Sequence, residues 1–128
     1  MSECQTSVLI LKDLSFQIMA AVFEVHNVLG PGFLEAVYQN ALFGELRQRG
    51  INAEAQKDIR IKYKGEDVGL YYPDILVNDQ VIIELKAVEK LTRLHEAQLF
   101  HYLKATGLKL GLLINFATEK VEYKRIVL

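Results

Sequence analysis

The sequence predicts a single α/β domain, in which helices flank a mixed β-sheet in the order α-α-β-β-β-α-β-β. Apolar residues recur at three- and four-residue steps through the first fifty positions, as in two amphipathic helices. Between 53 and 87 the texture changes to strand-like alternation. One more helical segment and two more strand segments then follow. With 128 residues, of which 51% are hydrophobic, the chain is long enough to bury one core.

The two opening helices are predicted over residues 13–30 and 33–50. Asp13 is a plausible N-cap of the first helix, and Gly30-Pro31 is a strong stop signal. Gly50 ends the second helix, so the tight corner Gly30-Pro31-Gly32 joins the pair. We expect residues 1–12 to form a partly ordered N-terminal segment of the one domain, which spans 1–128.

The segment 53–87 predicts three strands, separated by turns at Lys64-Gly65-Glu66 and at Asn78-Asp79. Pro73 lacks an N–H donor and places its neighbourhood at a sheet edge or a bulge. A third helix is predicted from Thr92, as N-cap, to Gly107. The near-continuous apolar run "LKLGLLINF" predicts a buried strand, and "VEYKRIV" predicts a last, half-exposed strand.

Charge and composition limit the classes of partner. The formal net charge is −1, so a nucleic acid would need a local positive surface to hold it. The lone cysteine, Cys4, cannot form an internal disulfide and fits a reducing compartment. No apolar run approaches the roughly 18 residues of a membrane span, and no signal-peptide pattern opens the chain. We therefore expect a cytoplasmic protein with no membrane partner.

The stretch "YYPDILVNDQVIIELKA" places charged residues inside strand material that is otherwise apolar. Glu84 and Lys86 share one strand face, and the turn at 78–79 would bring Asp74 beside Glu84. Two neighbouring carboxylates raise each other's pKa unless a cation intervenes. Hard oxygen ligands with a nearby lysine suit Mg²⁺ or Mn²⁺ and phosphodiester hydrolysis. The alternative is an ordinary cross-strand salt bridge on a solvated face.

Other residues support a site near these carboxylates. Glu35 lies in the opening turn of the second helix, where an acid also stabilises the helix end. Tyr38 follows one turn later. Gln98 and Tyr102 are four residues apart on the third helix, so they border either a polar site or satisfied core hydrogen bonds. His95 precedes Gln98 by one turn and could face the same site.

A strand-period set of cations, including Arg60 and Lys62, could grip a phosphate backbone or form a solvated strand face. Tyr71 and Tyr72 could stack on a base, although strand aromatics also serve as core or cross-strand partners.

These motifs occur in an order that resembles a known family. Gly32-x-x-Glu35-x-x-Tyr38, Pro73-Asp74 with Glu84-Leu85-Lys86, and Gln98-x-x-x-Tyr102 within 95–116 resemble the GxxExxY proteins of the PD-(D/E)XK nuclease superfamily over residues 13–127. The resemblance implies a restriction-endonuclease-like core and a metal-dependent nuclease that acts on DNA, less readily on RNA. The family pattern has a glycine after Asn115-Phe116, whereas this chain has Ala117.

The resemblance also implies roles for individual residues. Asp74, Glu84 and the Leu85 backbone carbonyl would hold Mg²⁺ or Mn²⁺, with Glu35 joining directly or through water. Lys86 would serve the attacking water, and Gln98 with Tyr102 would position the phosphate.

Two alternatives come from other functional classes. One is a catalytically silent nuclease-fold module that binds nucleic acid or protein, as the near-zero net charge favours. The other is a structural homodimer built on the apolar helical hairpin. A two-fold homodimer would also suit the nuclease, since a small domain has little room to grip a duplex.

Overall fold

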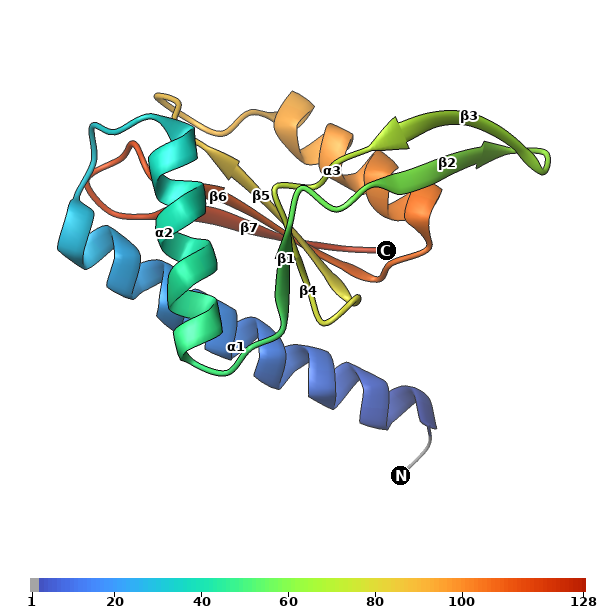
Figure 1. The fold of residues 1–128 in the computed structure, drawn as a ribbon, viewed down its shortest axis with the longest axis horizontal. Coiled ribbons are helices and arrows are strands. Elements are labelled where there is room, and N and C mark those ends of the chain that lie inside the picture. The colour runs from blue at the N-terminus through green and yellow to red at the C-terminus, as the bar shows by residue number, and fades with distance from the viewer. Residues whose placement is uncertain (1–2) are drawn as a thin grey trace.

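A computed structural model describes residues 3–128 of the chain, with side chains from residue 11 onward. Its elements, labelled in Figure 1, are α1 (Glu3–Leu29), α2 (Glu35–Gln48), β1 (Ala53–Ala55), β2 (Ile59–Tyr63), β3 (Glu66–Tyr71), β4 (Ile75–Val77), β5 (Val81–Lys86), α3 (Arg93–Thr106), β6 (Leu110–Asn115) and β7 (Glu122–Val127). The predicted α/β class is confirmed.

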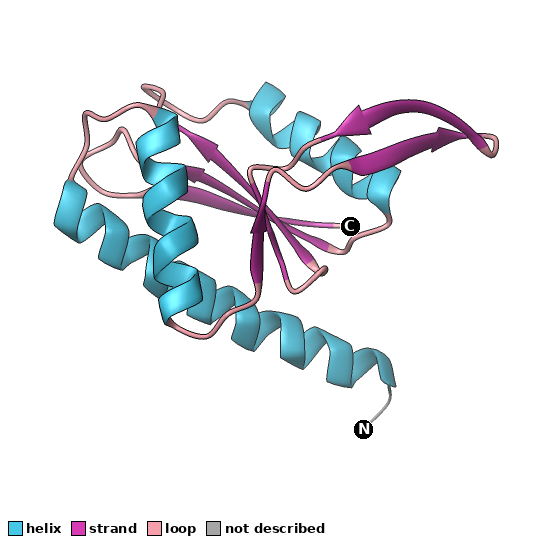
Figure 2. Cartoon of the chain, in the orientation of Figure 1, coloured by secondary structure: helices cyan, strands magenta, loops and turns pink. Residues whose placement is uncertain are grey.

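The central sheet has the strand order β1-β4-β5-β6-β7. Strands β5 and β6 run parallel and are linked through α3, while the other neighbouring pairs are antiparallel, so the sheet is mixed as predicted. Helices α1 and α2 cover one face of this sheet, and α3 covers the other (Figure 2). Each face therefore has its own apolar cluster, and β5 and β6 contribute side chains to both.

The first helix starts earlier than its sequence pattern predicts. It begins at Glu3, so Asp13 lies inside the helix and the predicted N-cap is wrong. Gly30 does end it, with a φ of 69° and an N–H that donates to the His26 carbonyl at 2.8 Å. Partial order over 1–12 stays a prediction, since residues 1 and 2 and the Cys4 side chain lie outside the described part. Over the described residues no helix is both long enough and apolar enough to cross a membrane.

The region 53–87 holds five strands where three were predicted. Pro73 separates β3 from β4, which confirms that it interrupts the ladder. As a consequence β2 and β3 pair only with each other and form a two-stranded hairpin apart from the central sheet. The turn at Asn78 and Asp79 has the two positive φ angles, 55° and 53°, that a tight hairpin requires.

The third helix matches its predicted limits. The Thr92 hydroxyl accepts a hydrogen bond from the His95 N–H at 3.2 Å, and His95 Nδ1 accepts one from the Thr92 N–H at 3.1 Å. This reciprocal capping box starts the helix, and Gly107 ends it with a φ of 76°. Close packing against β6 requires Gly111, because a Cβ there would lie 2.9 Å from Leu99. The α3 face that borders β5 is thereby held close to the sheet.

Candidate active site

Strand β5 supplies two of the predicted polar groups. Its residues Ile83 and Leu85 pack in the cluster under α1 and α2, while Ile82 packs in the cluster under α3. Because strand side chains alternate, Glu84 and Lys86 point to the α3 side. This is the division between the two strand faces that the sequence predicts.

The three-strand pattern predicts Asp74 within a strand. In the structure Asp74 lies instead in the loop before β4. Its Oδ2 accepts a hydrogen bond from the Leu85 N–H at 2.8 Å. Its backbone carbonyl accepts one from Gln39 Nε2 at 3.1 Å and one from the Gln56 N–H at 3.4 Å. Pairing of β4 with β5 stops at Ile75 and Ile83, so the edge of β5 beyond that point is open to the Asp74 carboxylate.

The backbone of Leu85 faces this same open edge. The Lys86 carbonyl accepts a hydrogen bond from the Phe116 N–H at 3.0 Å, on the β6 side. Since the N–H and C=O of one strand residue point to the same neighbour and alternate along the strand, the Leu85 carbonyl is directed away from β6, toward Asp74. Its position fits the predicted role of a backbone ligand.

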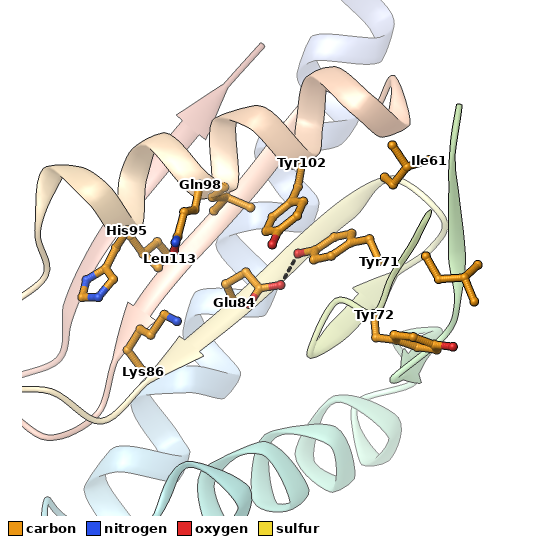
Figure 3. Close-up of a pocket in the computed structure, with 11 residues that line it drawn as sticks. Ile61, Tyr71, Tyr72, Glu84, Lys86, His95, Gln98, Tyr102 and Leu113 are labelled. Atoms are coloured by element: carbon orange, nitrogen blue, oxygen red, sulfur yellow. Dashed lines mark hydrogen bonds between the residues drawn. The ribbon is translucent and has the colours of Figure 1, made fainter. Parts of the chain in front are cut away.

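Glu84 is the carboxyl group of the site whose pKa is raised. Burial, together with the nearby Asp74 carboxylate, raises the pKa of Glu84 to about 7. A hydrogen bond from the Tyr71 hydroxyl to Glu84 Oε1 and the charge of Lys86 act in the opposite direction but do not cancel that rise in pKa. Burial and the Glu84 charge also raise the pKa of Tyr71, so the phenol stays protonated and donates (Figure 3).

Lys86 forms no ion pair with the described carboxylates. Within the described side chains no carboxylate oxygen lies within 4.0 Å of its ammonium, although its charge lowers the pKa of Glu84. The cross-strand salt bridge that formed the alternative interpretation is therefore not made in this part of the chain. Lys86 points its Nζ toward the space between Glu84 and Gln98 (Figure 3).

The three α3 residues with a predicted or possible place at the site line one pocket. His95, Gln98 and Tyr102 line a pocket of about 400 Å³ together with Glu84 and Lys86. The Tyr102 ring stacks on Tyr71, with centroids 3.7 Å apart and planes 10° apart. Among described residues neither Gln98 nor Tyr102 uses its side chain in a hydrogen bond, so the core hydrogen bond offered as their alternative is absent there.

Glu35 is not joined to the carboxylate pair. It is exposed at the start of α2, and the described residues contain no group of three or more His, Cys, Asp or Glu side chains placed to share a metal. Gln39, four residues later on the same face of α2, donates to the Asp74 carbonyl. Glu35 thus lies one helical turn before the residue that contacts the Asp74 backbone.

Tyr38 packs in the apolar core and does not line the pocket. Its side chain is fully buried and stacks on Phe116 with ring centroids 4.6 Å apart. Its hydroxyl donates to the Gly30 carbonyl at 2.5 Å and accepts from the Phe33 N–H at 3.2 Å. The motif tyrosine, proposed as an accessory site residue, instead holds together the corner between α1 and α2.

Arg60 and Lys62 are already paired. Asp67 accepts from Arg60 at 2.9 Å and lies 2.7 Å from the Lys62 ammonium, across the β2–β3 hairpin. These two cations lower the pKa of Asp67. The exposed stripe of the prediction therefore carries one less uncompensated positive charge than its cations alone indicate.

Sequence reasoning missed a clamp built on Asn115, which is fully buried at the end of β6. Its Nδ2 donates to the Val88 carbonyl at 2.8 Å and to Glu122 Oε1 at 3.1 Å, and its Oδ1 accepts from the Val88 N–H at 3.1 Å. The clamp fixes the loop that follows Lys86. A single amide at the end of an otherwise apolar run was the available signal. Ala117 donates its N–H to Asn115 Oδ1 at 3.2 Å and has no positive φ, so this turn does not require the family's glycine.

The donor set fits a hard divalent cation. Asp74 and Glu84 offer carboxylate oxygens, and the Leu85 carbonyl faces the same edge, which is the ligand chemistry of Mg²⁺ or Mn²⁺. Burial is the main cause of the raised pKa of Glu84 and the Asp74 carboxylate adds to it, so the site holds negative charge that Lys86 balances only in part. A bound cation would relieve that imbalance.

The chain is similar to known proteins in family and in fold. The family model of the PD-(D/E)XK nuclease superfamily matches residues 12–126. No curated protein matches the sequence. The crystal structure of SSO0001 aligns with a TM-score of 0.53 at 20% identity over 72% of this chain, which spans about half (48%) of that protein. The alkaline exonuclease LHK-Exo from Laribacter hongkongensis aligns at 14% identity with a TM-score of 0.48, over 83% of this chain and 75% of its own. On the family match, which covers most of its length, the chain belongs to the PD-(D/E)XK nuclease superfamily.

Proposed function

We propose that this protein is a metal-dependent nuclease of the GxxExxY family, which hydrolyses phosphodiester bonds of DNA in preference to RNA. The observation that carries the proposal is the half-buried pair of Asp74 and Glu84 beside Lys86, which forms no ion pair with a described carboxylate. The preference for DNA rests on the resemblance to the family motifs. Such an imbalance of charge costs stability unless the site serves a ligand, which favours a working site, and the family signature favours cleavage over binding alone.

Asp74, Glu84 and the Leu85 carbonyl would hold the cation, Mg²⁺ or Mn²⁺, and Glu35 would contribute through water. When bound, a divalent cation neutralises phosphate charge and lowers the pKa of a coordinated water. The protein supplies the rest of the arrangement. The Leu85 N–H holds the Asp74 carboxylate, and the Tyr71 hydroxyl holds one oxygen of Glu84.

Lys86 acts on the attacking water. Its ammonium has free N–H donors directed into the pocket, so it can orient that water and stabilise charge that develops on the phosphate. The Gln98 amide and the Tyr102 hydroxyl, on the facing helix, can donate hydrogen bonds to phosphate oxygens. His95, in the same wall, is a further donor. Arg60 and Lys62 share the Asp67 carboxylate and are exposed, so they could bind phosphate only in competition with that pairing.

A nuclease-fold module without catalytic activity is the second candidate. It is favoured by the Tyr71 hydroxyl, whose hydrogen bond to Glu84 Oε1 competes with metal ligation at that one of the two carboxylate oxygens. The net charge of −1 also favours weak or partner-assisted binding.

Cleavage of end-labelled single- and double-stranded DNA with Mg²⁺ or Mn²⁺ tests the proposal. Asp74→Asn keeps an acceptor for the Leu85 N–H but removes a charge, and Lys86→Ala removes the ammonium; each should lower the rate by at least about 100-fold. Lys120→Ala, at an exposed lysine outside the pocket, is the control and should cut like wild type. Cutting that persists in both site variants would come from a contaminant. Metal binding without cutting of any substrate would instead support the silent module.

A further inference from the structure

The pocket beside Glu84 has two chemically different ends. His95, Lys86 and Gln98 lie toward one end, Ile61 and Tyr72 lie toward the other, and Glu84 lies between them (Figure 3). Its volume of about 400 Å³ is near the lower limit of pockets that enclose one small ligand. It has room for one nucleotide unit but cannot enclose a base pair with its backbones.

The apolar end is built by the hairpin of β2 and β3, which stands apart from the central sheet (Figure 1). Leu70 is 52% exposed and Tyr72, which follows β3, is 50% exposed, yet both line the pocket. Arg60 and Lys62 on the same hairpin are paired with Asp67. The hairpin therefore offers aliphatic and aromatic surface to a ligand, and its two nearest cations share the single carboxylate of Asp67.

A duplex does not match such a surface. Proteins hold duplexes through phosphates, by Lys and Arg side chains that are free to neutralise them. In a duplex each base is also covered by its stacked neighbours. An unpaired base exposes its ring face, and stacking of that face on an aromatic side chain is the usual way in which single strands are bound. A nucleotide thus has the same division as this pocket, with an anionic end and an apolar, aromatic end.

The polar end also presents a defined donor. His95 Nδ1 accepts the Thr92 N–H at 3.1 Å, so in the neutral imidazole the proton is on Nε2. The capping box at the start of α3 therefore keeps the other ring nitrogen as a hydrogen-bond donor on the pocket wall. Together with the Lys86 ammonium, this places positive or donor groups where the phosphate of a bound nucleotide would lie.

We propose that the pocket takes one unpaired nucleotide of single-stranded DNA, with its phosphate between Lys86 and His95 and its base against Tyr72 and Leu70. The assignment rests on the proposed nuclease function and specifies its substrate: strands with an unpaired nucleotide next to the bond that is cut. Tyr72 is then a specificity residue, because it contacts the base and not the reacting phosphate.

Binding and cutting should be measured on one sequence in two forms, a single strand with 2-aminopurine at successive positions and its blunt duplex. Binding is followed by 2-aminopurine fluorescence with Ca²⁺, and cutting is followed with Mg²⁺. Wild type should bind the single strand at least about 10-fold more tightly than the duplex. Tyr72→Ala should weaken binding of the single strand by about 10-fold, as expected for the loss of one base–aromatic stack, whereas Tyr72→Phe should retain it. Tyr63→Ala, which removes an exposed tyrosine of the same hairpin outside the pocket, is the matched control.

The outcomes separate this assignment from the catalytic proposal. If the duplex is bound and cut as well as the single strand, or if Tyr72→Ala behaves like wild type, the assignment is overturned while the nuclease stands. If nothing is cut with Mg²⁺ or Mn²⁺, but the preference for the single strand persists and depends on Tyr72, catalysis is overturned and the assignment stands. Thermal unfolding of Tyr72→Ala should match wild type, since this side chain is half exposed.

Discussion

Two polar clusters lie side by side at the ends of β5 and β6, where Lys86 and Asn115 are paired in register. In the first, the Asn115 amide donates hydrogen bonds to the Val88 carbonyl and to Glu122, and accepts them from the Val88 and Ala117 N–H groups. A hydrogen bond from the Leu91 N–H lowers the pKa of Glu122. In the second, Asp74 and Glu84 are half-buried, and the shift has the opposite direction: the pKa of Glu84 rises to about 7. The first cluster is complete within the chain, whereas the second still lacks positive charge.

The difference separates a structural cluster from a functional one. Buried polar groups that satisfy one another stabilise a fold, whereas like charges held together cost stability and persist where a ligand balances them. The two clusters also cooperate, because the Asn115 clamp fixes the loop between Lys86 and α3. It therefore positions the two walls of the pocket relative to each other.

Breaking the Asn115 clamp should have the largest effect on folding. Asn115→Ala leaves the half-buried backbone groups of Val88 and Ala117 without partners and opens a gap where a fully buried side chain stood, so we expect the free energy of unfolding to fall by about 3 to 4 kcal/mol. Urea denaturation followed by circular dichroism measures the loss. Asn40→Ala, at an exposed position of α2, should change stability by less than about 0.5 kcal/mol. A loss below about 1 kcal/mol for Asn115→Ala would show that the clamp is not a structural unit.

Neutralising Glu84 should raise the free energy of unfolding, whereas Asn115→Ala lowers it. Since its pKa is about 7 in the folded state and 4.5 in the reference state, the metal-free folded protein binds more protons between these pH values. Its stability therefore falls as pH rises through that window and stays low above it. Glu84→Gln should be more stable than wild type by about 2 to 3 kcal/mol at pH 8 and nearly equal at pH 4. Identical pH slopes for the two proteins in urea titrations would contradict the assigned burial of charge.

A divalent cation should restore part of the free energy of unfolding that the carboxylate pair removes. At ten times its dissociation constant, Mg²⁺ would raise the free energy of unfolding by about 1.4 kcal/mol through mass action. Thermal unfolding with Mg²⁺ and with EDTA measures this without reference to activity. Asp74→Asn and Glu84→Gln should lose the shift, whereas Asn40→Ala should keep it. An equal shift in all four proteins would place the cation elsewhere.

The smallest expected effect concerns the departure from the family pattern. Ala117 has no positive φ, so a glycine there would only add freedom to the unfolded chain. Ala117→Gly should lower the free energy of unfolding by about 0.5 to 1 kcal/mol and leave cleavage unchanged. An increase in stability would mean that the turn after Asn115 is strained with alanine.

Much of the fold could be predicted from local pattern. Helical periodicity located α2 and α3, the Thr92 and Gly107 signals marked the ends of α3, and alternation placed Glu84 and Lys86 on one face of β5. These features depend on side chains a few residues apart, whose relation is set by the geometry of a helix or a strand. The polar residues of α3 could be assigned to one wall of a pocket for the same reason.

The sequence by itself determined the α/β class, the two faces of β5 and the identity of the carboxylate pair. Only the tertiary structure decided that Pro73 detaches a hairpin, that Asp74 reaches the Leu85 N–H from a loop, and that Tyr71 holds Glu84. It also left Glu35 a turn away from the pair and buried Tyr38 beneath the α1–α2 corner. These outcomes depend on contacts between residues far apart in the chain. Whether a charged or hydroxyl group ends beside a partner, beside a like charge or in solvent is set by packing, which a periodic pattern does not contain.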